Sequence, residues 1–303
     1  MSRIGDALKR AAAQAEAVEG RVDLPMERPS AGVLEDSDLR IYAKEPTGPA
    51  KAPVTRHQSE TTASDTGRVL AGQPAEWNRS LVGAQEIPEV AVEQYRRLAG
   101  SLHDLQLQRG IKTLMVSSAL PREGKTLTIT NLALTLSQSY GRRVLLIDAD
   151  LRHPSIHEAF GLRNVAGLAD VVRSGGRVTP IIELSERLSV LTAGHPDSNP
   201  LAQLSSPHVG DFLRAAAQQF DWVLVDTPPI GLISDAQTVA RICEAALFVV
   251  AAGSTPYALV QRGIAELGED RIAGIVLNRM RQKDLPNGEH YGPYYSSGLN
   301  ARL

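Results

Sequence analysis

Hydrophobic residues between positions 113 and 278 form short continuous runs, and stretches with helical spacing separate these runs. Runs of Val, Leu and Ile without polar alternation are typical of parallel strands that helices cover on both faces. The segments expected as strands are Thr113–Ser117, Val144–Asp148, Leu188–Thr192, Trp222–Asp226, Leu247–Ala251 and Ile272–Asn278. The segments expected as helices between them are Thr126–Tyr140, His208–Gln219, Asp235–Glu244 and Leu259–Leu267. The alternation predicts an α/β fold with a doubly wound, mainly parallel sheet, in which ligands bind at the carboxyl ends of the strands.

One more helix is expected directly before the first strand. Large apolar residues recur there at spacings of three and four, and these are Val92, Tyr95, Leu98, Leu102 and Leu105. Such spacing places them on one face of an amphipathic helix. Pro88 suits the first turn of that helix, because a first-turn residue needs no backbone N–H donor. We therefore place the folded domain at residues 88–280.

The two ends of the chain differ from this domain in their residue composition. Residues 1–20 predict a short amphipathic helix with Ile4 and Leu8 on one stripe, and it is either a frayed helix or a docking helix for a partner or a membrane surface. Residues 21–87 are rich in Pro, Ser, Thr and Gly and poor in aromatic residues, so they predict a disordered linker. Residues 281–303 predict a flexible tail that contains tyrosines.

Composition narrows the class of protein. The chain has 32 Lys and Arg against 34 Asp and Glu, and this balance favours neither nucleic acid nor an anionic membrane as a partner. Its single cysteine, Cys243, excludes an intrachain disulfide and a thiolate zinc cluster. The longest apolar run, Ala245–Ala252, is far shorter than the roughly 20 residues of a membrane-spanning helix. Because the first residues also lack the apolar centre of a secretory signal, we expect a cytoplasmic protein.

The segment between the first expected strand and its helix carries the clearest chemical motif. Its sequence, SALPREGKT over Ser118–Thr126, matches a phosphate-binding loop except that Ala119 replaces the first glycine. In such a loop, successive backbone N–H groups surround the β-phosphate, Lys125 reaches the β and γ oxygens, and Thr126 binds Mg²⁺. The residues expected to contact the nucleotide are Ala119, Pro121, Arg122, Glu123, Gly124, Lys125, Thr126 and Leu127.

Acidic residues follow two of the other strands. Asp226 ends an apolar strand, as does the carboxylate that holds the Mg²⁺ of a nucleoside triphosphatase. Asp148 and Asp150 lie two residues apart, so on an extended segment they project to the same side and could converge on one phosphate. One of the two would then serve as a general base, and the other would bind the metal. The alternative for Asp150 is a turn cap before Leu151.

Three motifs in this order resemble those of a known family. Ser118–Thr126, Leu146–Pro154 and Val223–Pro229 are similar to the Walker A, A′ and B motifs of bacterial protein-tyrosine kinases of the polysaccharide-export type, the CpsD/CapB family. The resemblance spans Pro88 to Tyr295. It includes a cluster of tyrosines near the end of the chain, namely Tyr291, Tyr294 and Tyr295.

The resemblance implies a fold, a reaction and a set of site residues. The fold would be a P-loop nucleoside triphosphatase of the MinD/ParA-like group, with ATP and Mg²⁺ as cofactors. Lys125, Asp148 and Asp150 would be catalytic, with Asp148 accepting the tyrosine proton. The metal would be held by Thr126, Asp150 and Asp226. The chain would be an autokinase that phosphorylates Tyr291, Tyr294 and Tyr295.

The resemblance also implies partners. Such a kinase regulates capsular or exopolysaccharide synthesis and export, and a separate transmembrane chain-length regulator would activate it at the inner face of the plasma membrane. Family members assemble rings through a Glu-x-x-Arg-x-x-Arg motif, of which this chain has Glu93 and Arg96 but Ala99 at the third position. Homo-oligomerisation therefore stays open.

Several alternatives remain at this point. A MinD/ParA-type ATPase switch without kinase activity would share the fold, but it typically carries a signature lysine where this chain has Leu120. An inactive nucleotide-binding scaffold is a third possibility.

Three single residues also have alternative roles. Arg152 either touches phosphate or pairs with a carboxylate, and Asn278 either contacts the adenine edge or caps the end of its strand. For Asp235, the pattern favours a helix cap over a role in supporting the site.

Overall fold

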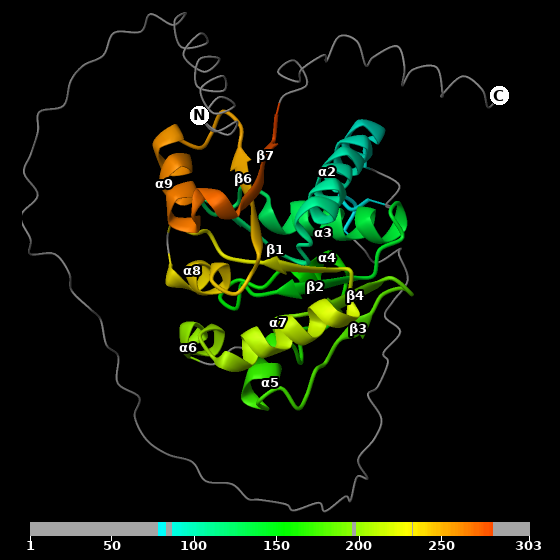
Figure 1. Cartoon of the computed structure of the whole chain (residues 1–303), viewed down its shortest axis with the longest axis vertical. Helices are drawn as coiled ribbons and strands as arrows, with labels where there is room; N and C mark the ends of the chain where they lie inside the picture. The colour runs from blue at the N-terminus through cyan, green and yellow to red at the C-terminus, as the bar shows by residue number, and fades with distance from the viewer. Residues whose placement is uncertain (1–77, 83–86, 196–197, 232, 281–303) are drawn as a thin grey trace, which may run out of the picture. The chain divides into compact units, whose positions relative to one another are not determined.

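The computed structural model describes residues 78–82, 87–195, 198–231 and 233–280 (Figure 1). All of them belong to the second of two compact units of the chain, Arg68–Leu303. The helix expected at 1–20, most of the linker expected at 21–87 and the tail expected at 281–303 lie outside the described residues.

The described domain is built on one sheet with strand order β3-β4-β2-β5-β1-β6-β7 (Figure 1). The strands are β1 (Thr113–Ser118), β2 (Val144–Asp148), β3 (Ile182–Glu183), β4 (Leu188–Leu191), β5 (Trp222–Asp226), β6 (Ala245–Ala251) and β7 (Ile272–Asn278). The short edge strand β3 runs antiparallel to β4, and all other neighbours in the sheet are parallel. This confirms the predicted α/β class with a mainly parallel sheet.

Helices cover both faces of the sheet, as the buried strands require. The longer ones are α2 (Glu89–Arg109), α3 (Lys125–Gln138), α7 (Pro207–Gln219), α8 (Ser234–Ala240) and α9 (Tyr257–Leu267). Residues of α2 and α3 form a core cluster with inward-facing residues of the strands, among them Leu114 and Val116 of β1. Met115 lies between those two and is equally buried, so by strand alternation it faces the opposite layer.

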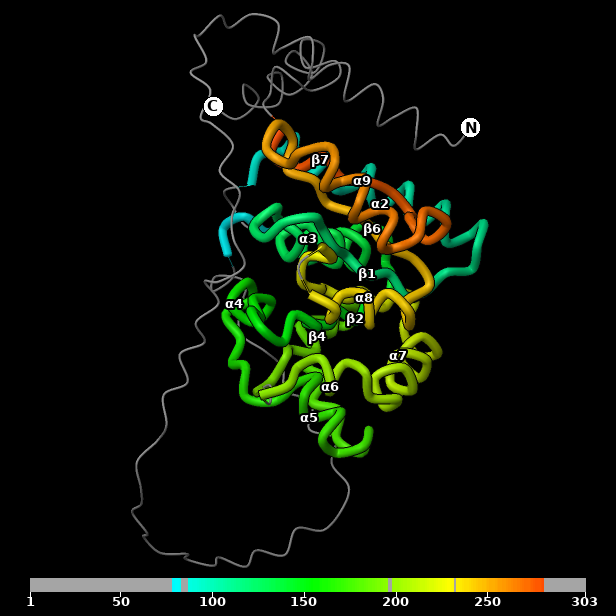
Figure 2. Tube along the Cα trace, turned by 90° about the vertical axis from the view of Figure 1, so that its left-hand side faces the viewer, coloured from blue at the N-terminus to red at the C-terminus, as the bar shows by residue number. Residues whose placement is uncertain are grey.

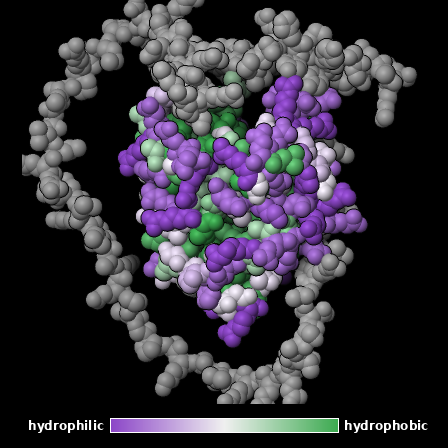
Figure 3. Space-filling model, in the orientation of Figure 1, coloured by the Kyte–Doolittle hydropathy of each residue, from purple (hydrophilic) through white to green (hydrophobic). Residues whose placement is uncertain are grey.

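Five short elements of the described domain were not expected from the sequence: the edge strand β3, the helices α4 (Ile156–Ala159), α5 (Leu168–Arg173) and α6 (Pro200–Leu204), and the 3-10 turn η2 (Glu269–Arg271). Both views of the chain place α5, α6 and α7 together near the β4 end of the sheet (Figures 1 and 2). The space-filling view shows a mainly hydrophilic face with scattered hydrophobic side chains, which is ordinary for a domain surface (Figure 3).

The largest error in the predicted boundaries lies at the junction between α8 and β6. The helix expected at Asp235–Glu244 is α8 and ends at Ala240, and the strand expected from Leu247 begins at Ala245. Ala245 pairs with Leu114 of β1, and its small apolar side chain is buried in the sheet. Alanine suits both helices and buried strands, so the sequence pattern did not locate this junction.

Residues 78–82 lie inside the range for which the composition predicts disorder, and here the structure differs. Leu81 is fully buried in the core cluster. The Val82 N–H donates to Asn131 Oδ1 of α3 at 2.6 Å, and Asn131 Nδ2 donates to the Ser80 carbonyl at 3.1 Å. The Asn78 N–H donates to the Ala159 carbonyl of α4 at 2.9 Å. This short segment is therefore held against α3 and α4.

Candidate active site

The phosphate loop connects β1 to α3, where the sequence placed it. Gly124 precedes the first helical residue and has φ of 92°, in the left-handed region that favours glycine. A Cβ atom at Gly124 would lie 2.1 Å from Asn278 Nδ2, so a side chain has no room there. No side chain caps α3, so the positive end of the helix faces the loop with first-turn N–H groups available to an anion.

Glu123 holds the loop in place with a carboxylate that is almost completely buried. Its Oε2 accepts the Leu120 N–H at 2.7 Å. Its Oε1 accepts the Ala251 N–H at 3.2 Å and the hydroxyl of Thr255, both just at the end of β6. The sequence suggested Glu123 only as part of the phosphate cradle, and the bracing by Thr255 had no local signal because the two residues are far apart in the chain.

Asn278 also contacts the loop. Its Nδ2 donates to the Glu123 carbonyl at 2.8 Å, and its Oδ1 accepts the Arg279 N–H at 2.9 Å. The last residue of β7 is thereby attached to the phosphate loop. Leu127, Pro121 and Arg122 are exposed at the same place, while Ala119 is buried at its base.

Lys125, Thr126 and Asp226 come together at the start of α3. The Thr126 hydroxyl donates to Asp226 Oδ2 at 2.6 Å. Burial lowers the pKa of Lys125, and the carboxylates of Asp226, Asp150 and Glu123 partly oppose that shift. The other oxygen of Asp226, Oδ1, is buried and has no hydrogen-bond partner among the residues that the structure describes.

Asp148 lies beside Asp226, because the two residues are register partners on β2 and β5. Asp148 Oδ2 accepts the N–H groups of Ser155 at 2.9 Å and Ile156 at 3.0 Å. Its Oδ1 accepts the Asp150 N–H at 3.2 Å. Burial, with the nearby charge of Asp226, raises the pKa of Asp148 to about 8, and burial raises the pKa of Asp226 to about 7.

Asp150 is partly exposed at the same edge. Its Oδ1 accepts the His153 N–H at 3.0 Å, and burial raises its pKa. The loop residue Ser155, which the sequence did not single out, points its hydroxyl at Thr126 Oγ1 at 3.2 Å. A serine before a helix predicts an N-cap, but Ser155 makes no side-chain cap of α4 and contributes to the site instead.

Arg152 pairs with a carboxylate, which was one of its two predicted roles. Its Nε lies 2.7 Å from Asp235 Oδ2, and its Nη2 lies 3.2 Å from Asp235 Oδ1. The favoured prediction for Asp235, a helix cap, was wrong. Ile233 is the N-cap of α8, and Asp235 lies within the first turn of that helix.

The residues present fit a nucleotide with Mg²⁺. In the described part of the chain, no three His, Cys, Asp or Glu side chains converge on one point to hold a metal ion. Mg²⁺ needs no such cluster, since it is commonly held by one or two carboxylates together with phosphates and water. Oδ1 of Asp226 has no hydrogen-bond partner among the described residues, and burial disfavours the ionised forms of Asp148 and Asp226, which a bound cation would favour.

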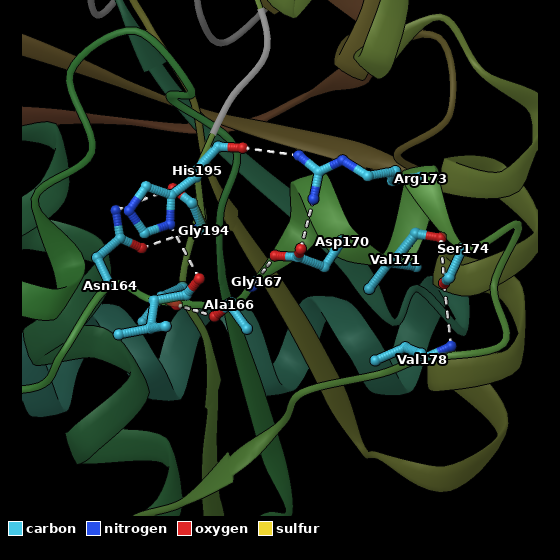
Figure 4. A network of polar contacts seen from close by, with 12 residues as sticks. Asn164, Ala166, Gly167, Asp170, Val171, Arg173, Ser174, Val178, Gly194 and His195 are labelled. Carbon is cyan, nitrogen blue, oxygen red and sulfur yellow. Dashed lines mark hydrogen bonds and ion pairs between the residues drawn. The ribbon is translucent and has the colours of Figure 1, made fainter. Parts of the chain in front are cut away.

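A polar network lies after the end of β4, the neighbour of β2 (Figure 4). The Gly194 N–H donates to Asn164 Oδ1 at 2.8 Å, and Asn164 Nδ2 returns a bond to the Gly194 carbonyl at 3.1 Å. Arg173 bonds both Asp170, at 2.6 Å, and the His195 carbonyl, at 3.0 Å. These contacts join the loop after β4 to α5 and to the segment before it.

Comparisons with known proteins identify the family. Tyrosine-protein kinase YwqD of Bacillus subtilis is 33% identical over 220 residues, which cover 71% of this chain and 91% of the relative. The chain belongs to the bacterial tyrosine-protein kinase family. No protein-family model matches the chain.

Two further relatives agree with the family. Tyrosine-protein kinase wzc of Salmonella typhimurium is 28% identical over 265 residues, covering 86% of this chain but 35% of that longer protein. The kinase domain of the Escherichia coli tyrosine kinase ETK superposes with a TM-score of 0.61 at 28% identity, covering 71% of this chain and 87% of that domain. The resemblance inferred from the three motifs is confirmed, as is the enzyme class, a protein-tyrosine kinase with a phosphate loop for a nucleotide.

The tyrosines expected to be phosphorylated, Tyr291, Tyr294 and Tyr295, lie outside the described residues of this kinase. None of the helices that the structure describes is long and apolar enough to cross a membrane.

Proposed function

We propose that this kinase transfers the γ-phosphate of ATP to Tyr291, Tyr294 and Tyr295 of its own C-terminal tail. The observation that carries the proposal is the convergence of Lys125 and Thr126 with the matched carboxylates Asp148 and Asp226 at the edge of the sheet. A phosphate loop alone would suit any nucleoside triphosphatase. Two buried carboxylates beside it supply both a metal position and a base.

Each side chain has a physical task in this reaction. The loop amides and Lys125 would bind the phosphates. Thr126, Asp226 and Asp150 would hold Mg²⁺, which when bound supplies charge neutralisation at the transferring phosphoryl group. Phosphoryl transfer needs positioning and electrostatic stabilisation more than covalent help from the protein.

Asp148 would accept the proton of the tyrosine hydroxyl. With a pKa of about 10, a free tyrosine is only ~0.1% ionised at pH 7, so a nearby carboxylate assists attack. The raised pKa of Asp148 makes it a stronger base than an ordinary aspartate once it is ionised.

The tail is long enough to bring its tyrosines to an active site. Tyr291 follows the last strand residue, Asn278, by 13 positions. At roughly 3.4 Å per residue an extended chain of that length spans up to about 44 Å, and Asn278 itself contacts the phosphate loop, so the length suffices to reach the kinase's own site. Phosphorylation at two or three positions would add several negative charges to one tail.

Two of the similar kinases are named CpsD, from Streptococcus agalactiae, and a further one is described as lying in a cps region of Klebsiella pneumoniae. Together with the motif resemblance, these names support a role in regulating capsular or exopolysaccharide synthesis and export.

A separate transmembrane chain-length regulator would activate the kinase at the inner face of the plasma membrane. A pull-down with the cytoplasmic segment of such a regulator tests this part, and full activity of the isolated kinase without any binding would contradict it.

Mass-spectrometric mapping of phosphotyrosine in the full chain, expressed with a candidate regulator, tests the proposed reaction. We expect phosphate on Tyr291, Tyr294 or Tyr295 in the parent and none in Lys125→Met, whose circular dichroism should match the parent. Absence of phosphotyrosine in a parent that hydrolyses ATP would favour an ATPase switch of the MinD/ParA type. Absence of both activities would favour an inactive scaffold.

A further inference from the structure

Arg152, in the loop that follows β2, and Asp235, in the first turn of α8, form an ion pair with two hydrogen bonds. The distances are 2.7 Å from Nε to Oδ2 and 3.2 Å from Nη2 to Oδ1. The Asp235 side chain is 2% exposed, and that of Arg152 is 40% exposed. A fork of two parallel hydrogen bonds fixes orientation as well as distance, which a single-point contact does not.

The pair differs from the other ion pairs described on the surface of the domain. Arg214 and Asp211, for example, lie one helical turn apart on α7 with side chains 72% and 64% exposed. Such exposed ion pairs contribute little to the free energy of unfolding. Asp235 is buried, and removal of its cation would leave a buried carboxylate without compensation. The Arg152–Asp235 contact is therefore one that the fold cannot lose without rearranging.

The loop of Arg152 carries Asp150. Asp150 donates its N–H to Asp148 Oδ1 at 3.2 Å, and it accepts the His153 N–H at 3.0 Å. These bonds form a compact turn in which Arg152 lies between Asp150 and His153. A displacement of Arg152 would consequently displace the Asp150 carboxylate.

The segment that leads to Asp235 begins after Asp226, the last residue of β5. α8 starts eight residues after Asp226, and Asp235 is its second residue. The ion pair thus ties the segment after Asp226 to the segment that carries Asp150, 83 residues away in sequence. Nε and Nη2 of the guanidinium are engaged by Asp235, and the charge of Arg152 also interacts with that of Asp150.

We infer that Asp235 is a positioning residue for phosphoryl transfer, which acts through Arg152 to hold the Asp150 loop against the Asp226 segment. This inference rests on the proposed function, in which Asp150 and Asp226 help to hold Mg²⁺. Asp235 itself touches neither nucleotide nor tyrosine. Its loss should impair the use of Mg²⁺ rather than the binding of nucleotide phosphates by the loop and Lys125.

The test compares Asp235→Asn, Arg152→Ala, the double variant and Arg152→Lys in the full chain with its activator. Tyrosine phosphorylation and ATP hydrolysis are measured over a range of Mg²⁺ concentrations, and binding of a fluorescent ATP analogue is measured in EDTA. We expect Asp235→Asn to lower kcat at least tenfold and to raise the half-saturating Mg²⁺ concentration several-fold, with analogue binding in EDTA within twofold of the parent. Arg152→Lys should be intermediate. Asp211→Asn, the matched loss of a surface pair, should behave as the parent.

The double variant measures whether Arg152 and Asp235 act together on activity. If the two residues act as one unit, it loses no more activity than the worse single variant. Additive losses would overturn the inference, as would a folded Asp235→Asn with the parent's kcat and Mg²⁺ dependence. If Asp235→Asn does not fold, an unchanged Arg152→Lys overturns it instead. A parent that phosphorylates no tyrosine contradicts the proposed function alone, because the Mg²⁺ dependence of ATP hydrolysis still tests the ion pair.

Discussion

Asp148 and Asp226 occupy matched positions at the ends of β2 and β5, where both side chains are buried and Lys125 is, among the described residues, the one buried cation beside them. Asp148 is stabilised by three backbone N–H groups, whereas one oxygen of Asp226 has no partner among the described residues. Two adjacent buried carboxylates destabilise the domain when both are ionised and no metal is bound. The arrangement therefore stores electrostatic strain that nucleotide and Mg²⁺ would relieve.

The first prediction concerns the pH dependence of stability without metal. The pKa values of Asp148 and Asp226 in the folded domain, about 8 and about 7, lie above the ordinary value of 3.8. Between pH 4 and 8 the folded domain thus binds more protons than the unfolded chain, and its free energy of unfolding falls as pH rises. Asp226→Asn should flatten this fall and raise the Tm at pH 8 more than at pH 5, as thermal unfolding in EDTA would show.

Asp211→Asn, on the exposed face of α7, is the control and should leave the shape of the pH curve unchanged. Saturating ATP analogue with Mg²⁺ should also flatten the curve of the parent. Parallel curves for the parent and Asp226→Asn would contradict the electrostatic account of the site.

The strands with continuous apolar runs and the three motifs could be predicted because their signals are local, whereas the two-residue strand β3 has no such run and was missed. Val144–Asp148 and Trp222–Asp226 are continuous apolar runs that end in an acid, and both were placed without error. The short helix α6 had usable local signals, since Asn199 caps it and Pro200 occupies its first turn. Arg152 and Asp235 lie 83 residues apart, so neither residue's surroundings could indicate the partner.

The second prediction concerns the segment before α2. Leu81 is fully buried in the core cluster, although the composition around it predicts disorder. Leu81→Ala should lower the free energy of unfolding by about 2–5 kcal/mol, the range for a buried leucine that leaves a cavity. Leu107→Ala is the control, because Leu107 is 71% exposed on α2 and should change stability by roughly 0.5 kcal/mol or less. Equal effects of the two changes in urea unfolding would show that residues 78–82 are not part of the stable core.

The third prediction concerns Arg122 in the phosphate loop. Arg122 has φ of 61°, a left-handed conformation that is unfavourable for residues with a Cβ atom and most unfavourable for β-branched ones. Arg122→Val should therefore lower the free energy of unfolding relative to Arg122→Gly by about 1–2 kcal/mol. Urea unfolding of the nucleotide-free domain measures the difference. Equal stability of the two variants would indicate that the loop adopts another backbone conformation in solution.

The fourth prediction concerns the acceptor tyrosines. Changing Tyr291, Tyr294 and Tyr295 together to Phe removes three hydroxyls from a segment that follows the last strand, at a distance from the nucleotide contacts in the sequence. Incorporation of labelled phosphate should fall to a small fraction of the parent's, while binding of an ATP analogue stays within twofold. Restoring one tyrosine at a time would rank the three positions, because each variant then has a single acceptor in the cluster. Undiminished labelling of the triple variant would place the acceptor elsewhere, with Tyr42 as the first position to examine. The chain would then still be a kinase, as its family indicates, but its tail would not be the substrate.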